Sequence, residues 1–233
     1  MASPPLPPRG AVLITRPEPG AAETAARVAA LGWEPVLAPA LVLRPRDIVI
    51  GRAQALLLTS RAAARALPPP IPGLPVLAVG EATAEEARAR GWQAEAAAGT
   101  ARDLAEMAAQ RLDPRAGPLL LAVGQGYALD LAADLRARGF RAIRRIAYRA
   151  EPATGLPPEA IRAWEDGRIG AVLFHSPRSA LCAITLIRDA GLAAGAAQME
   201  VLAISRRVAD AAAAAISPAA WRALRVADRP GEE

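Results

Sequence analysis

The sequence has very little of the residue types on which most enzyme active sites depend. Its 233 residues include a single cysteine, Cys182, a single histidine, His175, and no lysine. One cysteine excludes an internal disulfide and a cysteine-based metal cluster, and it is typical of a reducing compartment. One histidine excludes a multi-histidine metal site within the chain, and a Ser-His-Asp triad would have to use it. The absence of lysine excludes a Walker-type phosphate loop.

Long hydrophobic runs are missing as well. No uninterrupted apolar run reaches the ~18 residues that a membrane-spanning helix needs. Residues 1–10 contain several prolines and no apolar segment of the kind found in secretory signals. We therefore expect a cytoplasmic protein that makes no contact with a membrane.

The composition nevertheless predicts a folded protein with a sizeable core. Hydrophobic residues make up 53% of the chain and charged residues 22%, which excludes a disordered chain. The net charge of +5 favours an anionic partner. The arginines are scattered, and no basic block has aromatic residues interleaved with it, so the sequence does not predict binding to nucleic acid.

The dominant pattern is a short apolar run, a polar or glycine-containing turn and an alanine-rich helix, and it occurs six times. Continuous apolar strands followed by helices predict parallel sheets that are covered on both faces. We expect the six strands at residues 11–14, 55–58, 76–79, 119–123, 171–174 and 201–204. Further short strands are expected near residues 34–43, 93–97, 143–149 and 224–227.

The six units form two sets of three, which indicates an internal duplication. Residues 13–16 are similar to residues 121–124, and residues 57–60 are similar to residues 173–176. The third pair is residues 76–80 with residues 201–205.

Two proline-flanked stretches interrupt this pattern and predict a discontinuous domain. Proline blocks helix and biases the residue before it toward extended geometry, so both stretches are expected to be strands that connect two domains. A ligand site is then expected in a cleft between the two domains of a bilobal molecule. The predicted bounds are 1–36 plus 153–233 for the first α/β domain, 46–144 for the inserted one, and 37–45 and 145–152 for the connector strands.

In its ordered set of motifs the chain resembles the uroporphyrinogen-III synthase (HemD) family. The resemblance runs from about Val12 to Pro230, and its motifs are Leu13-Ile14-Thr15-Arg16-Pro17, Gly32-Trp33, Leu58-Thr59-Ser60, Ala78-Val79-Gly80-Glu81-Ala82-Thr83-Ala84, Gly99-Thr100-Ala101-Arg102-Asp103-Leu104, Tyr148-Arg149, Phe174-His175-Ser176-Pro177-Arg178-Ser179-Ala180 and Ala203-Ile204-Ser205. It implies two flavodoxin-like parallel-sheet domains joined by a two-stranded β connector.

The same resemblance implies an activity. It implies a monomeric lyase of tetrapyrrole biosynthesis without cofactor or metal. The enzyme would convert the linear tetrapyrrole hydroxymethylbilane to uroporphyrinogen III, with inversion of ring D and loss of water. Transient contact with the upstream deaminase is a further expectation. The substrate carries eight carboxylates and a leaving hydroxyl, so the protein mainly has to position it and help one proton move.

The candidate site residues follow from the resemblance and from the strand-to-helix turns. Tyr148 matches the family's functionally implicated tyrosine, and its phenol could donate a proton to the departing hydroxyl. Backbone N–H groups at helix N-termini and arginines in the turns suit carboxylates. The expected substrate-binding residues are Thr15, Arg16, Ser60, Thr83, Gly124, Ser176, Arg178 and Ser205.

Simpler roles are available for most of these residues. Tyr148 could only pin the connector, and Ser60, Thr83 and Ser176 could only cap helices. We expect His175 to be structural. Two functions also remain beside the synthase: a non-catalytic, ligand-binding protein of the same form, or a synthase relative that has lost turnover.

Three further observations bear on these alternatives. Val208 stands where the family often has a hydroxyl, and this departure keeps a synthase relative without turnover among the alternatives. Cys182 falls on an apolar helix face and is expected to be a buried small hydrophobe. Residues 124–126, Gly-Gln-Gly, lack the full spacing of a dinucleotide-binding turn, so nucleotide binding is not predicted.

Overall fold

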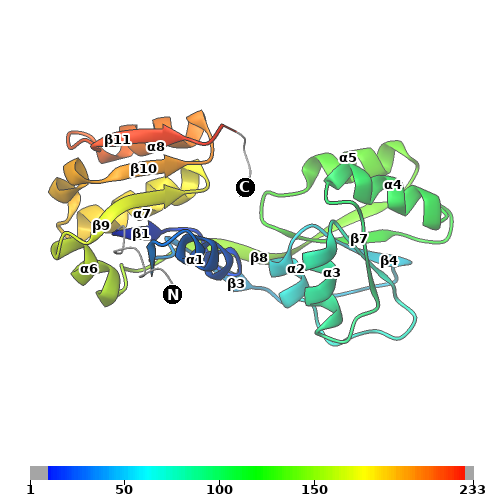
Figure 1. The fold of residues 1–233 in the computed structure, drawn as a ribbon. Helices are drawn as coiled ribbons and strands as arrows, with labels where there is room; N and C mark the ends of the chain where they lie inside the picture. The colour runs from blue at the N-terminus through cyan, green and yellow to red at the C-terminus, as the bar shows by residue number, and fades with distance from the viewer. Residues whose placement is uncertain (1–9, 229–233) are drawn as a thin grey trace, which may run out of the picture. The chain divides into compact units, whose positions relative to one another are not determined.

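The computed structural model describes residues 10–228, and the expectations for residues 1–9 and 229–233 lie outside this part of the chain. The chain divides into two compact units. Unit 1 holds the described residues up to Val42 and those from Glu151 onward, and unit 2 holds Leu43–Ala150. Unit 1 therefore combines the blue N-terminal ribbon with the yellow-to-red C-terminal ribbon of Figure 1. The sequence-based bounds of the domains and of the connector stay predictions.

Unit 1 is built on a five-stranded sheet in which all neighbouring strands are parallel. The order across the sheet is β11-β10-β9-β1-β2. Its strands are β1 (Ala11–Ile14), β2 (Glu34–Leu37), β9 (Ile169–Phe174), β10 (Glu200–Ala203) and β11 (Ala223–Val226). All four residues of β1 are buried, as expected for a strand that is covered on both faces.

Helices cover the two faces of this sheet unequally. On one face Leu13, Val172 and Phe174 pack with the apolar residues of α6 (Pro158–Glu165), α7 (Pro177–Asp189) and α8 (Arg206–Ile216). On the other face Val12 and Ile14 pack with α1 (Gly20–Ala30). A 3₁₀ helix, η1 (Ala193–Gln198), precedes β10. Cys182 in α7 is only partly buried, less than the sequence predicts, and it packs against the larger of these two clusters.

Unit 2 is built on a six-stranded sheet in the order β3-β8-β7-β4-β5-β6 (Figure 1). The strands are β3 (Leu41–Pro45), β4 (Ala55–Leu58), β5 (Val76–Ala78), β6 (Ala94–Ala96), β7 (Leu119–Gly124) and β8 (Ala142–Pro152). The strands from β8 to β6 pair in parallel. Two hydrogen bonds flank β3, one from Ala153 N to Ala40 O and one from Arg46 N to Ala147 O. The residue number rises along one segment as it falls along the other, so β3 lies antiparallel to β8.

Four helices cover both faces of this sheet. Leu56 and Leu58 of β4 face α2 (Arg61–Arg65) and α3 (Glu81–Arg88), whereas Ala55 and Leu57 face α4 (Ala101–Arg111) and α5 (Leu129–Ala137). This alternation explains why the whole strand reads as a continuous apolar run.

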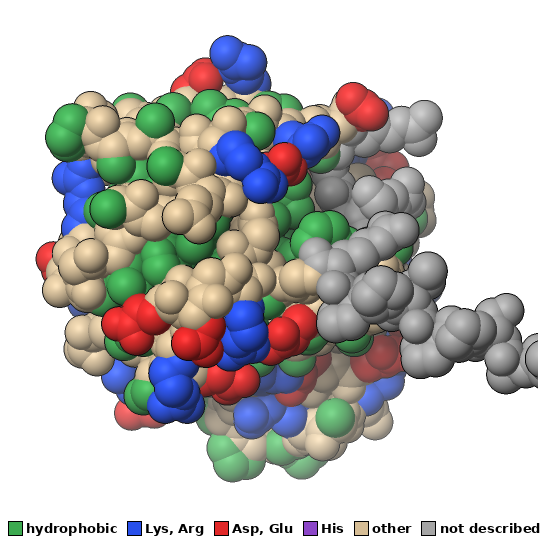
Figure 2. Space-filling model, turned by 60° about the vertical axis from the view of Figure 1, so that its left-hand side comes forward, with side chains coloured by type: hydrophobic (Ala, Val, Ile, Leu, Met, Phe, Trp, Pro, Cys, Tyr) green, Lys and Arg blue, Asp and Glu red, His purple; other side chains and the backbone are tan. Residues whose placement is uncertain are grey.

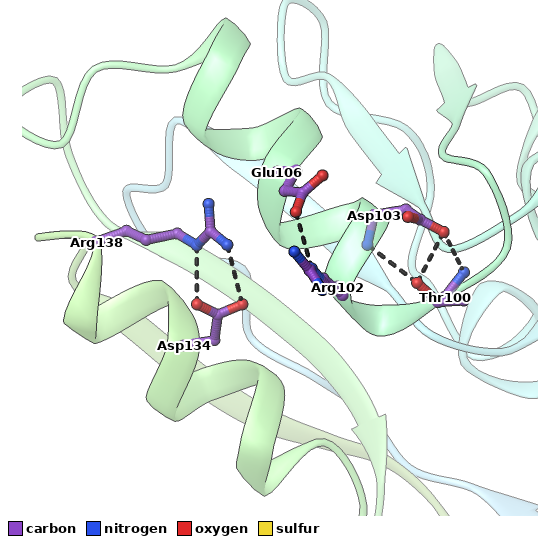
Figure 3. Close-up of polar contacts among 6 residues, drawn as sticks. All are labelled: Thr100, Arg102, Asp103, Glu106, Asp134 and Arg138. Carbon is purple, nitrogen blue, oxygen red and sulfur yellow. Dashed lines mark hydrogen bonds and ion pairs between the residues drawn. The ribbon is translucent and has the colours of Figure 1, made fainter.

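Helix α4 begins with a capping box, which Figure 3 shows. The Thr100 hydroxyl accepts from the Asp103 N–H at 3.1 Å, and the Asp103 carboxylate accepts from the Thr100 N–H at 3.0 Å. Ion pairs of Arg102 with Glu106 and of Arg138 with Asp134 lie on the exposed surfaces of α4 and α5. Exposed pairs with this spacing stabilise helices only slightly.

The two sheets agree with the internal duplication. Reading both sheets in the same direction gives β2-β1-β9-β10-β11 in unit 1 and β8-β7-β4-β5-β6 in unit 2. Each strand pair that the sequence matches, β1 with β7, β9 with β4 and β10 with β5, therefore occupies an equivalent place. The turns that follow these strands are equivalent too, and this correspondence relates the candidate site residues of one unit to those of the other.

Candidate active site

The candidate residues gather at the carboxyl ends of parallel strands, one set in each unit. In an open α/β sheet, ligands bind at this edge, at the point where the connections that leave two adjacent strands go to opposite sides. That switch point lies between β1 and β9 in unit 1 and between β4 and β7 in unit 2. Unit 2 holds Ser60, Thr83, Gly124 and Tyr148, and unit 1 holds Thr15, Arg16, Ser176, Arg178 and Ser205.

Tyr148 lies in β8, and its side chain reaches past Gly124 at the end of β7 to Ser60, at the switch point of unit 2. Its backbone pairs with Gly124 at the end of β7, after a shift of register between Val123 and Gly124, and its carbonyl accepts from the Gln125 N–H at 3.1 Å. Its ring packs against the apolar cluster under α2 and α3. The Ser60 hydroxyl donates to the Tyr148 hydroxyl at 3.3 Å. The structure thus brings two predicted residues, Ser60 and Gly124, into direct contact with a third, Tyr148.

The surroundings of Tyr148 keep its phenol protonated. Burial raises the pKa of the phenol above its ordinary value of 10, the hydrogen bond from Ser60 opposes this shift, and the neighbouring Tyr127 adds a smaller increase. At neutral pH the group is therefore a hydrogen-bond and proton donor.

Ser60 serves two functions at once. It is the N-cap of α2, where its Oγ accepts from the Ala63 N–H at 3.2 Å, which confirms the predicted cap. The same hydroxyl keeps its own proton for the bond to Tyr148. The cap fixes the position of Oγ, so the partner of the phenol is held in place by the backbone of α2.

Thr83 is not an N-cap. The N-cap of α3 is Gly80, and Thr83 is the third residue of the helix, with a side chain that is only 6% exposed. It lies on the α2/α3 face of the sheet, the face against which Tyr148 packs. The sequence suggests a cap because a threonine near a helix start has that role, but the helix begins at Glu81.

In unit 1, Thr15 ties together the two strands at the switch point. It is fully buried after β1, and its hydroxyl donates to the carbonyl of Leu173 in β9 at 2.8 Å. Its side chain therefore holds the edge together. Because the only proton of the hydroxyl is used in this bond, it does not point to a ligand.

Arg16 is the next residue, and its guanidinium lies over the first turn of α1. Its Nη1 donates to the Thr24 hydroxyl at 3.2 Å. A Cβ on Gly20 would stand 2.4 Å from the Cζ of Arg16, so a glycine at this position leaves room for the guanidinium. Gly20 could not be predicted as part of this site, since no local sequence pattern links a glycine to an arginine four residues earlier.

His175 directly follows β9 and lies near the same guanidinium. Burial, and secondarily the positive charge of Arg16, lower the pKa of the imidazole from 6.5 to about 4. His175 is therefore neutral at physiological pH, and it presents no positive charge to an anionic ligand.

Ser176 begins α7 with a capping box, and this confirms the predicted cap. Its Oγ accepts from the Ser179 N–H at 3.0 Å, and the Ser179 hydroxyl in turn accepts from the Ser176 N–H at 3.2 Å. The spacing Ser176-x-x-Ser179 is a capping signal that the sequence analysis did not use. Arg178, in the first turn, is exposed.

Ser205 is the N-cap of α8 by backbone geometry, but its side chain makes no capping hydrogen bond. Val208, three residues later, is 2% exposed and belongs to the apolar core of unit 1. Val208 occupies the place in α8 that Thr83 occupies in α3. A hydroxyl at position 208 would stand among apolar side chains, so its absence suits the packing of this chain.

Two hollows lie in unit 1. One of about 390 Å³ lies between α1 and the ends of β9, β10 and β11, and its lining includes the apolar Leu173, Leu202 and Ile204 as well as Arg27 and His175. A second, of about 730 Å³, lies at the amino ends of the strands, beside Ile169 and Gly170. The position of the second hollow disfavours it as a ligand site of this fold.

Other kinds of site find little support. Within residues 10–228, no three His, Cys, Asp or Glu side chains lie close enough to hold a metal ion together. No helix in that range is long and apolar enough to cross a membrane. On the face drawn in Figure 2, arginines and acidic side chains are interspersed, and this differs from the contiguous basic surface that nucleic acid favours.

Comparison with solved structures supports the fold. The chain is similar to the uroporphyrinogen-III synthetase of Helicobacter pylori 26695, with 11% identity and a TM-score of 0.57, over 96% of this chain and 94% of that chain. A mutant uroporphyrinogen III synthase from the extremely thermophilic bacterium Thermus thermophilus shows 19% identity and a TM-score of 0.45, over 94% of both chains. Comparison with curated protein sequences found no match.

The comparison with family models covers most of the chain. The model of uroporphyrinogen-III synthase HemD matches residues 22–233. This range includes all of unit 2 and all of unit 1 from the first turn of α1 onward. The resemblance that the sequence motifs carry is thereby confirmed, and the chain belongs to the uroporphyrinogen-III synthase (HemD) family.

Proposed function

We propose that this chain converts hydroxymethylbilane to uroporphyrinogen III, with inversion of ring D and loss of water. The observation that carries the proposal is the position of Tyr148 in a chain of this family. Its phenol is partly buried, is protonated at neutral pH and has a fixed hydrogen-bond partner in Ser60, which follows the switch-point strand β4. A donor of this kind suits the departure of the substrate hydroxyl.

Tyr148 acts as the proton donor in this proposal. The phenol transfers its proton to the terminal hydroxyl as the C–O bond breaks, and water leaves. The bilane is left as an electrophilic azafulvene, which the electron-rich ring D attacks to form a spirocycle. The proton that is released when the last pyrrole regains its aromaticity restores the phenol. The bond from Ser60 stabilises the transient phenolate.

The eight carboxylates of the substrate bind mainly to backbone and arginine donors. The N-termini of α3, α7 and α8 lie at carboxyl edges and present N–H groups with a favourable helix dipole. Arg16 and Arg178 add charge-assisted hydrogen bonds. The neutral His175 contributes polarity and no charge. Because the pyrroles of the substrate are themselves reactive, these groups promote the reaction mainly by positioning the substrate.

Further features of the proposal rest on the family. We expect a monomer that needs no cofactor, works in the cytoplasm and receives its labile substrate from the upstream deaminase by transient contact. Size-exclusion chromatography with light scattering, with and without the deaminase, tests the oligomeric state and the contact.

Isomer analysis tests the activity. Hydroxymethylbilane is generated by its own upstream enzyme and supplied with and without this protein, and the oxidised uroporphyrins are separated into types I and III. Spontaneous closure gives type I, so we expect a protein-dependent shift to type III. If a folded sample gives only type I, catalysis is excluded, and binding of the bilane to that sample would then favour a ligand-binding protein or an inactive relative.

A further inference from the structure

Gly124 lies directly under the ring of Tyr148. A Cβ at this position would stand 2.6 Å from the Cζ, 2.8 Å from the hydroxyl oxygen and 2.9 Å from the Cε2 of Tyr148. Non-bonded carbon atoms prefer a separation of about 3.5–4.0 Å. The ring and any side chain at position 124 therefore cannot both occupy their present places.

The backbone itself does not require a glycine here. Gly126 and Gly139 have positive φ angles of 85° and 89°, and there a glycine is needed for its conformational freedom. Gly124 has no such angle; it is the last residue of β7 and pairs with Tyr148 in β8. The reason for a glycine at position 124 is the aromatic ring.

The ring cannot give way easily. Its backbone is held by the pairing with Gly124 and by the hydrogen bond from Gln125, its body packs against the cluster under α2 and α3, and its hydroxyl is bonded to Ser60. Gly20 offers a contrast, because the group that a Cβ would meet there is the guanidinium of Arg16, the far end of a flexible side chain. An added methyl group displaces Arg16 cheaply, but it displaces Tyr148 only by disturbing several contacts.

We propose that Gly124 is a positioning residue: it reserves the place in which the hydroxyl end of the Tyr148 ring contacts the end of β7, with its hydroxyl at Ser60. This inference rests on the proposed function for its catalytic consequence, but the positioning itself concerns only the folded protein. This positioning role differs from the direct contact with substrate that the sequence predicts for Gly124. The loss of a proton donor's position lowers kcat more than it changes KM.

A double-mutant cycle on stability tests the positioning. Gly124→Ala is made in the natural chain and in Tyr148→Ala, and the melting temperatures are compared. With the tyrosine present we expect a drop of roughly 5 °C from overpacking. With the tyrosine removed the drop disappears, because the methyl group then has room. Gly80→Ala, at the N-cap of α3 where an added Cβ meets only an ordinary contact, should change the melting temperature equally in both backgrounds.

The outcomes separate the alternatives. An equal drop in both backgrounds would show that position 124 needs a glycine for its backbone, and it would overturn the proposal. The absence of a drop in either background would overturn it as well, because the ring would then have room to spare. The melting temperatures in the two backgrounds are measured without substrate. If the substitutions at positions 124 and 148 couple strongly but the chain gives only type I product, the proposed function is refuted and the positioning of Tyr148 by Gly124 still holds.

A spectroscopic measurement covers the case in which Tyr148→Ala does not fold. The chain has two tyrosines, so Tyr127→Phe leaves Tyr148 as the only phenol. Ultraviolet titration of this variant should give a pKa above 10, and adding Gly124→Ala should bring the pKa back toward 10 as the ring leaves its buried place. An unchanged pKa would overturn the proposal.

Discussion

Acidification should weaken this protein through its single histidine. His175 is partly buried and near Arg16, and together these features hold the pKa of the imidazole at about 4 in the folded chain. In the unfolded chain the pKa is about 6.5. Between these values the unfolded state binds a proton that the folded state does not, so stability is full above pH 6.5 and falls as the pH approaches 4.

The size of the effect follows from the two pKa values. At pH 4.5 the difference corresponds to about 2.5 kcal/mol for an isolated titration. Solvent around a partly buried imidazole screens part of this, and we expect about 1–2 kcal/mol. His175→Gln, which is neutral throughout, should lack this dependence.

Urea denaturation of both proteins at pH 7.5 and pH 4.5 measures the effect. Tryptophan fluorescence reports mainly on unit 1, since Trp33, Trp164 and Trp221 of the four tryptophans lie there. Carboxylates titrate equally in both proteins and cancel in the comparison. The stability lost on acidification should be about 1–2 kcal/mol larger for the natural chain. An equal loss in both proteins would refute the reasoning and show that His175 has an ordinary pKa.

Three further outcomes are expected. Gly20→Ala should raise KM with little effect on the melting temperature, because the added methyl group displaces the guanidinium of Arg16. Steady-state kinetics measure KM, and a thermal melt measures the stability. Thr15→Val should lower the free energy of unfolding by about 1 kcal/mol in urea, because the bond to Leu173 is lost. Asp103→Asn should destabilise at pH 7, and in thermal melts this cost should shrink as the pH is lowered below 3.8. The bonds at the start of α4 lower the pKa of the Asp103 carboxyl, so its stabilising effect is present above 3.8 and is lost as the pH falls through the folded pKa.

The strands were predictable because burial on both faces removes their polar positions. β4 and β7 consist of apolar residues and one terminal glycine, and such runs bounded by turns indicate strands of a parallel sheet. The internal duplication was readable for the same reason, and the equivalent strand orders agree with it. Ser60 and Ser176 were predictable as caps because a serine directly after such a strand precedes a helix.

Two helices were missed because they do not follow the strand-turn-helix pattern that the analysis used. α4 and α6 carry many charged residues and stand between the repeated units. Local signals were nevertheless present. Thr100-x-x-Asp103 has the spacing of a capping box, and Pro158 is suited to the first position of a helix.

The contacts of the candidate site could not be predicted from the sequence. That Tyr148 meets Gly124 and Ser60 depends on the register of β7 with β8 and on the shift within it, which no local pattern encodes. The burial of Thr83 depends on where α3 begins and on the face that it packs. The sequence named Tyr148, Ser60 and Gly124 as separate candidates, and the sheet order makes them neighbours.

The most direct test of the account is the rate at which Tyr148→Phe forms type III uroporphyrinogen from saturating hydroxymethylbilane, relative to the natural chain. Removing only the hydroxyl leaves the ring against Gly124 and the fold unchanged. If Tyr148 donates the proton, kcat should fall by about 10²–10³-fold while the melting temperature changes by less than about 3 °C. An undiminished rate of type III formation by a folded variant would contradict the account and remove Tyr148 from the chemistry.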